Sequence, residues 1–136
     1  MLKLIRVAML ALAFIPAIAM ASSGAYTEID ASKLLEMQKN VPNLVVIDSR
    51  GGEWFDDRVI EGAVNLSASD TNEENLAKII PSKDTPIVFY CSSLECPASK
   101  AAAHQAKDAG YNNIYKYPGG LKDWEEKNLP IVSYTH

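Results

Sequence analysis

The sequence contains two cysteines, Cys91 and Cys96, and these are the residues best suited to covalent chemistry. A cysteine thiolate is a strong nucleophile and can form a disulfide, a persulfide or a sulfenate. One disulfide across four intervening residues would stabilise a whole domain only weakly, because the loop that it closes is short. Reactivity therefore explains the pair better than cross-linking does. The alternative is an inert thiol buried at the end of a strand.

The segment that follows Cys91 is suited to holding an anionic sulfur. A short loop leads from a predicted strand into a helix that begins near Pro97. Backbone N–H groups in such a loop lack helical partners, so they can stabilise a thiolate and lower the thiol pKa. Glu95 would oppose this effect if it lay near the sulfur. The predicted substrate-binding loop comprises Ser92, Ser93, Leu94, Glu95 and Cys96.

The elements that must position this loop are those of a three-layer α/β domain, with a mostly parallel sheet flanked by helices. Uninterrupted, β-branched runs predict buried strands at 44–47 and 87–90, with a weaker one at 113–117. Helices are expected at 31–39, 71–80 and 97–109, the first capped by Asp30 and the last ended by Gly110. Ligands bind beyond the carboxyl ends of the strands in such folds, so the active site is expected at Cys91.

The composition is that of a single globular domain, and the N-terminal segment predicts that this domain is exported. The chain has 136 residues, 48% of them hydrophobic, and its formal net charge of -4 offers no footprint for nucleic acid. A positive start, an apolar stretch too short to span a membrane and the sequence Ala19-Met20-Ala21 predict a signal peptide over residues 1–21. Residues 22–136 are then one domain, periplasmic or secreted, with no membrane attachment after cleavage.

Other conspicuous residues have structural interpretations. Asp48 and Arg50, after the first buried strand, are expected to form a structural hydrogen-bonded pair rather than to contact substrate. Aromatic side chains are expected to pack in the core or at its edge: Trp54, Phe55 and Trp124. The two histidines and two cysteines lack the spacing of a zinc site, so no metal is expected.

Several motifs, taken in order, resemble those of the rhodanese family of sulfurtransferases over residues 26–132. They are Asp48-Ser49-Arg50 (D-x-R), Glu53 and Phe55, Gly62-Ala63-Val64-Asn65 (G-A-x-N), the strand carrying Cys91, and Gly119-Gly120 with Trp124 and Pro130 (G-G-x-x-x-W and a following proline). Each motif is weak alone, but their order and spacing together are specific. The resemblance implies a rhodanese-like fold. It also implies that Cys91 takes the outer sulfur of a donor such as thiosulfate, becomes a persulfide, and passes that sulfur to cyanide or a thiol, without a cofactor.

The sequence departs from this family in the loop. A glycine is usual near the position of Leu94, and a cationic or hydroxyl residue often follows. The absence of a loop cation weakens the expected binding of thiosulfate, for which Arg58 or Lys100 could compensate as an anion guide; Arg58 is otherwise a solvated cation. Related phosphatases and arsenate reductases need an arginine six residues after the nucleophile, where this chain has Pro97, so phosphatase chemistry is not expected.

Cys96 is the most informative departure. A loop that curls around an anion could bring the two Cα atoms within the roughly 4.4–6.8 Å that a disulfide tolerates. Cys96 could then resolve a persulfide or sulfenate on Cys91 and leave a reversible disulfide. The other interpretation is a small buried residue at the start of a helix.

The sequence is therefore compatible with three functions. The first is a sulfurtransferase acting through a Cys91 persulfide, with a small sulfur-containing anion or thiol, or a protein sulfur acceptor, as its partner. The second is a non-enzymatic module that binds a persulfide or sulfur carrier. The third is a thiol redox protein that uses Cys91 and Cys96, which predicts reduction by dithiols and no sulfur product.

Overall fold

The computed structural model describes residues 24–136, so the predicted signal peptide lies outside the described residues. Its centre is a five-stranded sheet with the order β1-β6-β5-β2-β4, in which all neighbouring strands are parallel. The strands are β1 (Thr27–Glu28), β2 (Val45–Asp48), β4 (Val64–Asn65), β5 (Ile87–Tyr90) and β6 (Ile114–Tyr117). The prediction of a mostly parallel α/β sheet is confirmed.

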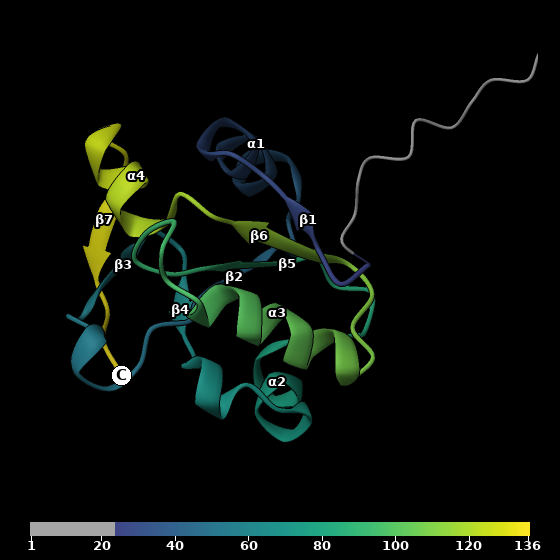
Figure 1. Ribbon diagram of the computed structural model, residues 1–136. Coiled ribbons are helices and arrows are strands. Elements are labelled where there is room, and N and C mark those ends of the chain that lie inside the picture. The colour runs from purple at the N-terminus through teal and green to yellow at the C-terminus, as the bar shows by residue number, and fades with distance from the viewer. Residues whose placement is uncertain (1–23) are drawn as a thin grey trace, which may run out of the picture.

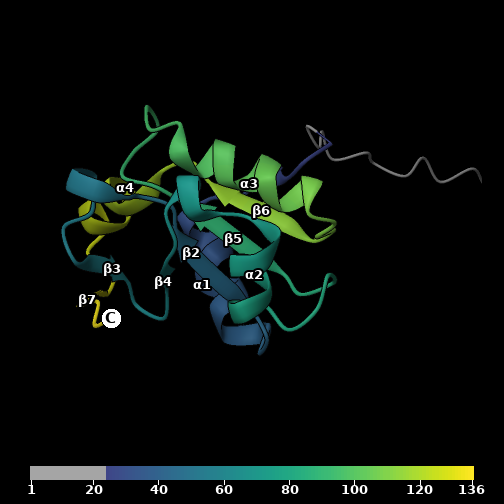
Figure 2. The ribbon, with the colours of Figure 1, turned by 90° about the horizontal axis from the view of Figure 1, so that it is seen from below.

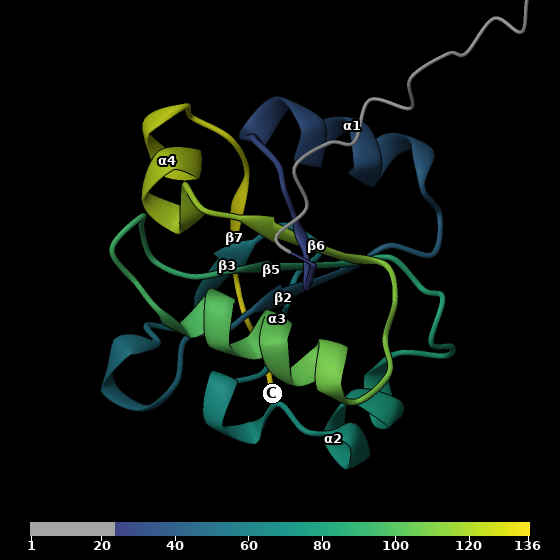
Figure 3. The same cartoon turned by 45° about the vertical axis from the view of Figure 1, so that its right-hand side comes forward.

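Helices cover both faces of this sheet, so the domain has three layers (Figure 1). The helices are α1 (Ala31–Asn40), α2 (Glu73–Ile79), α3 (Ala98–Asp108) and α4 (Gly120–Glu126). α1 and α4 lie on one face, and α2 and α3 lie on the other, as Figures 2 and 3 show from two further directions. Neighbouring residues of one strand therefore face different cores. Val88 packs in the cluster beneath α1 and α4, whereas Phe89 packs in the cluster with α2 and α3.

The helix boundaries follow from local chemistry. The Asp30 side chain accepts a hydrogen bond from the Lys33 N–H at 2.8 Å and caps α1, as predicted. Asn72 caps α2 in the same way through the Asn75 N–H. Gly110 follows the end of α3 with φ +94°, a left-handed conformation that costs glycine little. The predicted helices are confirmed, with ends that differ by one or two residues.

A second, small sheet lies to one side of the central sheet (Figure 1) and was not predicted. It pairs β3 (Arg58–Ile60) with β7 (Ile131–Ser133) in antiparallel register, joining segments more than seventy residues apart. Val59 and Ile60 are buried. Two short 3₁₀ helices, η1 (Gly52–Trp54) and η2 (Ala68–Asp70), complete the elements.

The register of the parallel strands brings two segments of interest together. Asp48 at the end of β2 pairs with Tyr90 at the end of β5, so the Asp48-Ser49-Arg50 and Cys91 segments leave adjacent strands at the same edge. None of the helices in the described part of the chain is both long and apolar enough to cross a membrane.

Candidate active site

Cys91 directly follows β5, whose four residues are all buried. Its own side chain is also buried, with 2% of the residue exposed, and it lines a pocket of about 520 Å³. The rest of the lining comes from the segment after β2, the loop after Cys91 and the start of α3: Arg50, Gly51, Trp54, Ser92, Ser93, Glu95, Cys96, Pro97 and Ala98. The predicted strand-to-loop junction is therefore a concave site.

The start of α4 fixes the backbone of Cys91 and Ser92. The Leu121 N–H donates to the Cys91 carbonyl oxygen and the Lys122 N–H donates to that of Ser92, both at 2.9 Å. Gly120, with φ +65°, allows this approach, since a Cβ atom there would lie 2.5 Å from the Cys91 carbonyl oxygen. The glycine pair in the sequence thus positions the loop that follows the nucleophile.

The same contacts orient two loop amides. The C=O and N–H groups of a trans peptide point in opposite directions, and residues 24–136 contain no cis peptide bond. Because the Cys91 and Ser92 carbonyls face α4, the N–H groups of Ser92 and Ser93 point away from α4, which contributes no residue to the pocket lining. Neither N–H donates to a backbone carbonyl within the described residues.

The remainder of the loop turns back toward Cys91. The Cys96 N–H donates to the Ser93 carbonyl at 3.1 Å, and Pro97 then precedes α3. Four of the five predicted loop residues line the pocket. Leu94 does not: it is 77% exposed and lies against a shallower hollow beside α4, lined in part by Lys122 and Glu126.

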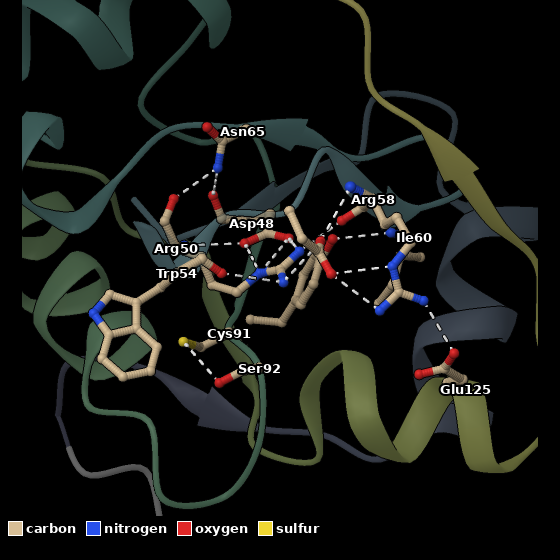
Figure 4. Close-up of polar contacts among 11 residues, drawn as sticks. Asp48, Arg50, Trp54, Arg58, Ile60, Asn65, Cys91, Ser92 and Glu125 are labelled. Atoms are coloured by element: carbon tan, nitrogen blue, oxygen red, sulfur yellow. Dashed lines mark hydrogen bonds and ion pairs between the residues drawn. The ribbon is translucent and has the colours of Figure 1, made fainter. Parts of the chain in front are cut away.

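Cys91 and Cys96 are joined by a disulfide, with their Cα atoms 6.1 Å apart. This separation lies within the range expected from the sequence. The Ser92 hydroxyl oxygen lies 3.9 Å from the Cys91 sulfur (Figure 4). The structure therefore represents the oxidised form, and Cys91 becomes a nucleophile only after this bond is reduced.

Asp48 and Arg50 form a buried ion pair beneath the site (Figure 4). The Arg50 Nη2 atom lies 2.9 Å from Asp48 Oδ2, and Arg50 also donates to Asp56 and to the Arg58 carbonyl oxygen. Burial disfavours the charged guanidinium, but the hydrogen bond and charge of Asp48, with the charge of Asp56, outweigh it and raise the Arg50 pKa. This network supports the structural role predicted for the pair.

The structure brings neither Arg58 nor Lys100 to the pocket lining. Arg58 pairs with Asp56 at 3.0 Å and with Glu125 at 3.0 Å, and these two partners raise its pKa. Lys100 is exposed on α3. Arg50 is consequently the one cationic residue among the pocket-lining residues, and Asp48 and Asp56 already neutralise it.

Asp56 is held ionised by the same network. Burial raises the pKa of its carboxyl group, but hydrogen bonds from Arg58 and the positive charges of Arg50 and Arg58 outweigh burial, so the pKa lies below its usual value.

The expectation that Trp54 packs in or beside the core was wrong. Trp54 is 76% exposed and forms part of the pocket wall near Cys91 (Figure 4), whereas Trp124 is buried as expected. The position of Trp54 in the sequence could have indicated its place in the site. Trp54 lies in a glycine-containing segment after β2, at the edge of the sheet where Cys91 follows β5. The structural role of Asn65, which the sequence showed only as part of the G-A-x-N motif, was not predicted. Its side chain donates to the carbonyls of Asp48 and Arg50, at 3.1 and 2.8 Å, and anchors this loop.

A comparison of the sequence with models of protein families identifies a family whose match covers this site. A sequence model described as "Rhodanese-like domain" matches residues 30–127, which include four of the five strands of the central sheet, the Cys91 loop and α4. The chain belongs to the rhodanese-like family. The resemblance seen in the sequence motifs is therefore confirmed.

Curated relatives of this rhodanese-like chain include named sulfurtransferases. It is 30% identical to "Thiosulfate sulfurtransferase GlpE" of Shewanella oneidensis over 105 residues, covering 76% of this chain and 96% of the relative. It is 28% identical to "Uncharacterized protein YibN" of Escherichia coli K12 over 94 residues, covering 68% and 64% respectively. These similarities support a rhodanese-type sulfurtransferase in general.

Solved structures show the same fold. A Bacillus halodurans protein aligns with a TM-score of 0.70 at 23% identity, covering 79% of this chain and 77% of its own. A structure named "rhodanese with anions from E. coli" aligns with a TM-score of 0.54 at 27% identity, covering 66% and 98%. The three-layer architecture is thus that of rhodanese-like domains.

Proposed function

We propose that this chain is a sulfurtransferase that moves a sulfane sulfur from a donor such as thiosulfate to a thiophilic acceptor through a persulfide on Cys91. The observation that carries the proposal is the position of Cys91 at the end of β5, in a pocket beside loop amides without backbone partners. The relative from Shewanella oneidensis, which is named as a thiosulfate sulfurtransferase, supports the same chemistry.

In the first step, the reduced Cys91 thiolate attacks the outer sulfur of thiosulfate. A new bond forms between this sulfur and Cys91 Sγ, and sulfite leaves with the electron pair of the broken S–S bond. The Ser92 and Ser93 N–H groups, which point away from α4, are available to stabilise negative charge on the transferred sulfur. The Ser92 hydroxyl, 3.9 Å from Cys91 Sγ, is a further donor on that side.

In the second step, cyanide or a thiol attacks the outer sulfur of the persulfide. The S–S bond breaks, the sulfur leaves with the acceptor, and Cys91 departs as a thiolate that can react again. No step needs a metal or an organic cofactor.

The charges of the pocket limit how tightly an anionic donor binds. Arg50 is already paired with Asp48 and Asp56, and Glu95 adds a negative charge to the lining. A thiosulfate dianion must therefore rely on backbone amides. We expect a high KM for thiosulfate and a lower one for a donor with less negative charge.

A thiosulfate–cyanide assay on pre-reduced, desalted protein tests the proposal. Cys96→Ser protein, which cannot form the Cys91–Cys96 disulfide, should form thiocyanate, and Cys91→Ser and Cys91→Ala proteins should not, while all three variants keep the melting curve of the reduced wild type. Turnover retained in a folded Cys91 variant would remove Cys91 from the mechanism. A stable persulfide without thiocyanate would instead support the sulfur-carrier alternative.

We also propose that the protein acts beyond the cytoplasmic membrane. The predicted signal peptide at 1–21 supports this proposal. Cell fractionation should find a shortened chain in the periplasm or medium. Full-length protein in the cytoplasm would contradict it.

A further inference from the structure

Cys96 is placed to react with whatever Cys91 carries. Both residues line the same pocket, their Cα atoms are 6.1 Å apart, and the two sulfurs are already bonded in the oxidised structure. The turn closed by the Cys96 N–H and the Ser93 carbonyl directs Cys96 back over the end of β5. The Cys91–Cys96 disulfide is therefore compatible with an intact sheet and intact helices.

We infer that Cys96 resolves the Cys91 persulfide and releases its outer sulfur as hydrosulfide, so that the protein reduces thiosulfate at the expense of a dithiol. This inference rests on the proposed function, because it needs the persulfide to form. It identifies an internal acceptor, a second sulfur product and the class of reductant.

The resolving step balances as follows. The Cys96 thiolate attacks Cys91 Sγ and forms the Cys91–Cys96 bond, while the bond between Cys91 Sγ and the outer sulfur breaks. The outer sulfur leaves with that electron pair and the persulfide proton as hydrosulfide. The two cysteine sulfurs are thereby oxidised and the outer sulfur is reduced.

An external dithiol then returns the protein to its reduced form. One thiolate of the dithiol attacks the disulfide, and its second thiol completes the exchange, leaving two protein thiols and an oxidised dithiol. Cys96 is half-buried whereas Cys91 is 2% exposed, so the attack is directed to Cys96. Cys91 is the leaving group and is regenerated as the thiolate that the next donor needs.

The neighbouring charges are compatible with this sequence of steps. No cation among the pocket-lining residues is free to hold the transferred sulfur, since Arg50 is paired with Asp48 and Asp56. Glu95 precedes Cys96 in the chain and also lines the pocket. Its negative charge repels that of an anionic persulfide on Cys91 and so destabilises it. The pocket therefore favours departure of the sulfur as an anion.

A single-turnover experiment with thiosulfate alone tests the inference. Reduced, desalted wild-type protein should release about one equivalent each of sulfite and hydrosulfide and finish as the disulfide. Cys96→Ser and Cys96→Ala should release sulfite, keep the extra sulfur on Cys91 and release hydrosulfide at least roughly a hundredfold more slowly at micromolar protein. The reason is that a tethered thiol acts at an effective concentration in the millimolar range. Ala101→Ser, an exposed change on α3, is the matched control and should behave as wild type.

Each other outcome identifies which proposal fails. A wild-type protein that keeps its persulfide beside a free Cys96 thiol, detected by alkylation and peptide mapping, overturns the inference and leaves the sulfurtransferase intact. Equal hydrosulfide release by wild type and both Cys96 variants also overturns it. Absence of sulfite from every protein overturns the proposed function itself. The alkylation readout uses wild-type protein, so it holds even if a Cys96 variant fails to fold.

Discussion

Gly120 controls the backbone on which the proposed chemistry depends, and its replacement by alanine should disturb both stability and activity. Its φ of +65° costs an L-residue about 1–2 kcal/mol. The new Cβ would also lie 2.5 Å from the Cys91 carbonyl oxygen and 2.9 Å from the Ser92 carbonyl carbon. Relief of this contact must move the loop away from α4.

The expected loss follows from the bonds that hold the loop. Moving it weakens the hydrogen bonds from the Leu121 and Lys122 N–H groups, each worth about 0.5–1.5 kcal/mol. Gly120→Ala should therefore lower the free energy of unfolding by roughly 2–4 kcal/mol. A displaced nucleophile should also slow sulfite release by roughly 10- to 100-fold in the protein that remains folded.

Gly110→Ala provides the matched control. Gly110 also has a positive φ, +94°, but it follows the far end of α3 from the Cys91 loop. A Cβ atom added at Gly110 would have the Lys83 side chain, 4.0 Å away, as its nearest neighbour. This variant should lose about 1–2 kcal/mol and keep the wild-type rate of sulfite release. Urea unfolding and single-turnover sulfite release give both quantities. If Gly120→Ala matched Gly110→Ala in both, the argument that α4 positions the nucleophile would be refuted.

Three further variants test the electrostatics and the pocket wall. Because the folded-state pKa of Asp56 is lowered, its stabilisation is present above the unfolded pKa and is lost as the pH falls through the folded pKa. Asp56→Asn should therefore destabilise the protein at pH 7, and its urea midpoint should fall less steeply than that of the wild type below about pH 4. Wild-type and variant midpoints that fall in parallel with pH would contradict this. Glu95→Gln should lower the KM for thiosulfate by roughly two- to fivefold at low salt and should leave it unchanged at about 1 M salt, where the charge of Glu95 is screened. Glu126→Gln, whose residue lies outside the pocket, is the control and should leave KM unchanged at both salt concentrations. Trp54→Ala should change the free energy of unfolding by less than about 0.5 kcal/mol and raise KM; an unchanged KM would remove Trp54 from the binding surface.

The buried strands of the central sheet were predictable because their residues must be apolar on both faces. The strands Ile87–Tyr90 and Val45–Asp48 lie between two helical layers, and the uninterrupted apolar runs at 87–90 and 44–47 reflect that position. The short strands β3 and β7 carried no comparable signal. Their pairing depends on contacts between distant segments, which neither segment shows alone.

The same contrast holds at the site. The Cys91 junction could be predicted, because a strand that ends in a cysteine before a helix places it at the binding edge. The exposure of Trp54 could not, since residue type predicts packing while the loop anchored by Asn65 decides where the ring lies. Nor could the sequence alone choose between an inert Cys96 and a bonded one, because that choice depends on how the loop turns at Ser93.

The most direct test of the central claim is peptide mass spectrometry of reduced Cys96→Ser protein after incubation with thiosulfate. The account predicts one added sulfur atom, removable by cyanide, on the peptide that contains Cys91, and none when Cys91 is also replaced by serine. Folded Cys96→Ser protein that acquires no sulfur at Cys91 would contradict it.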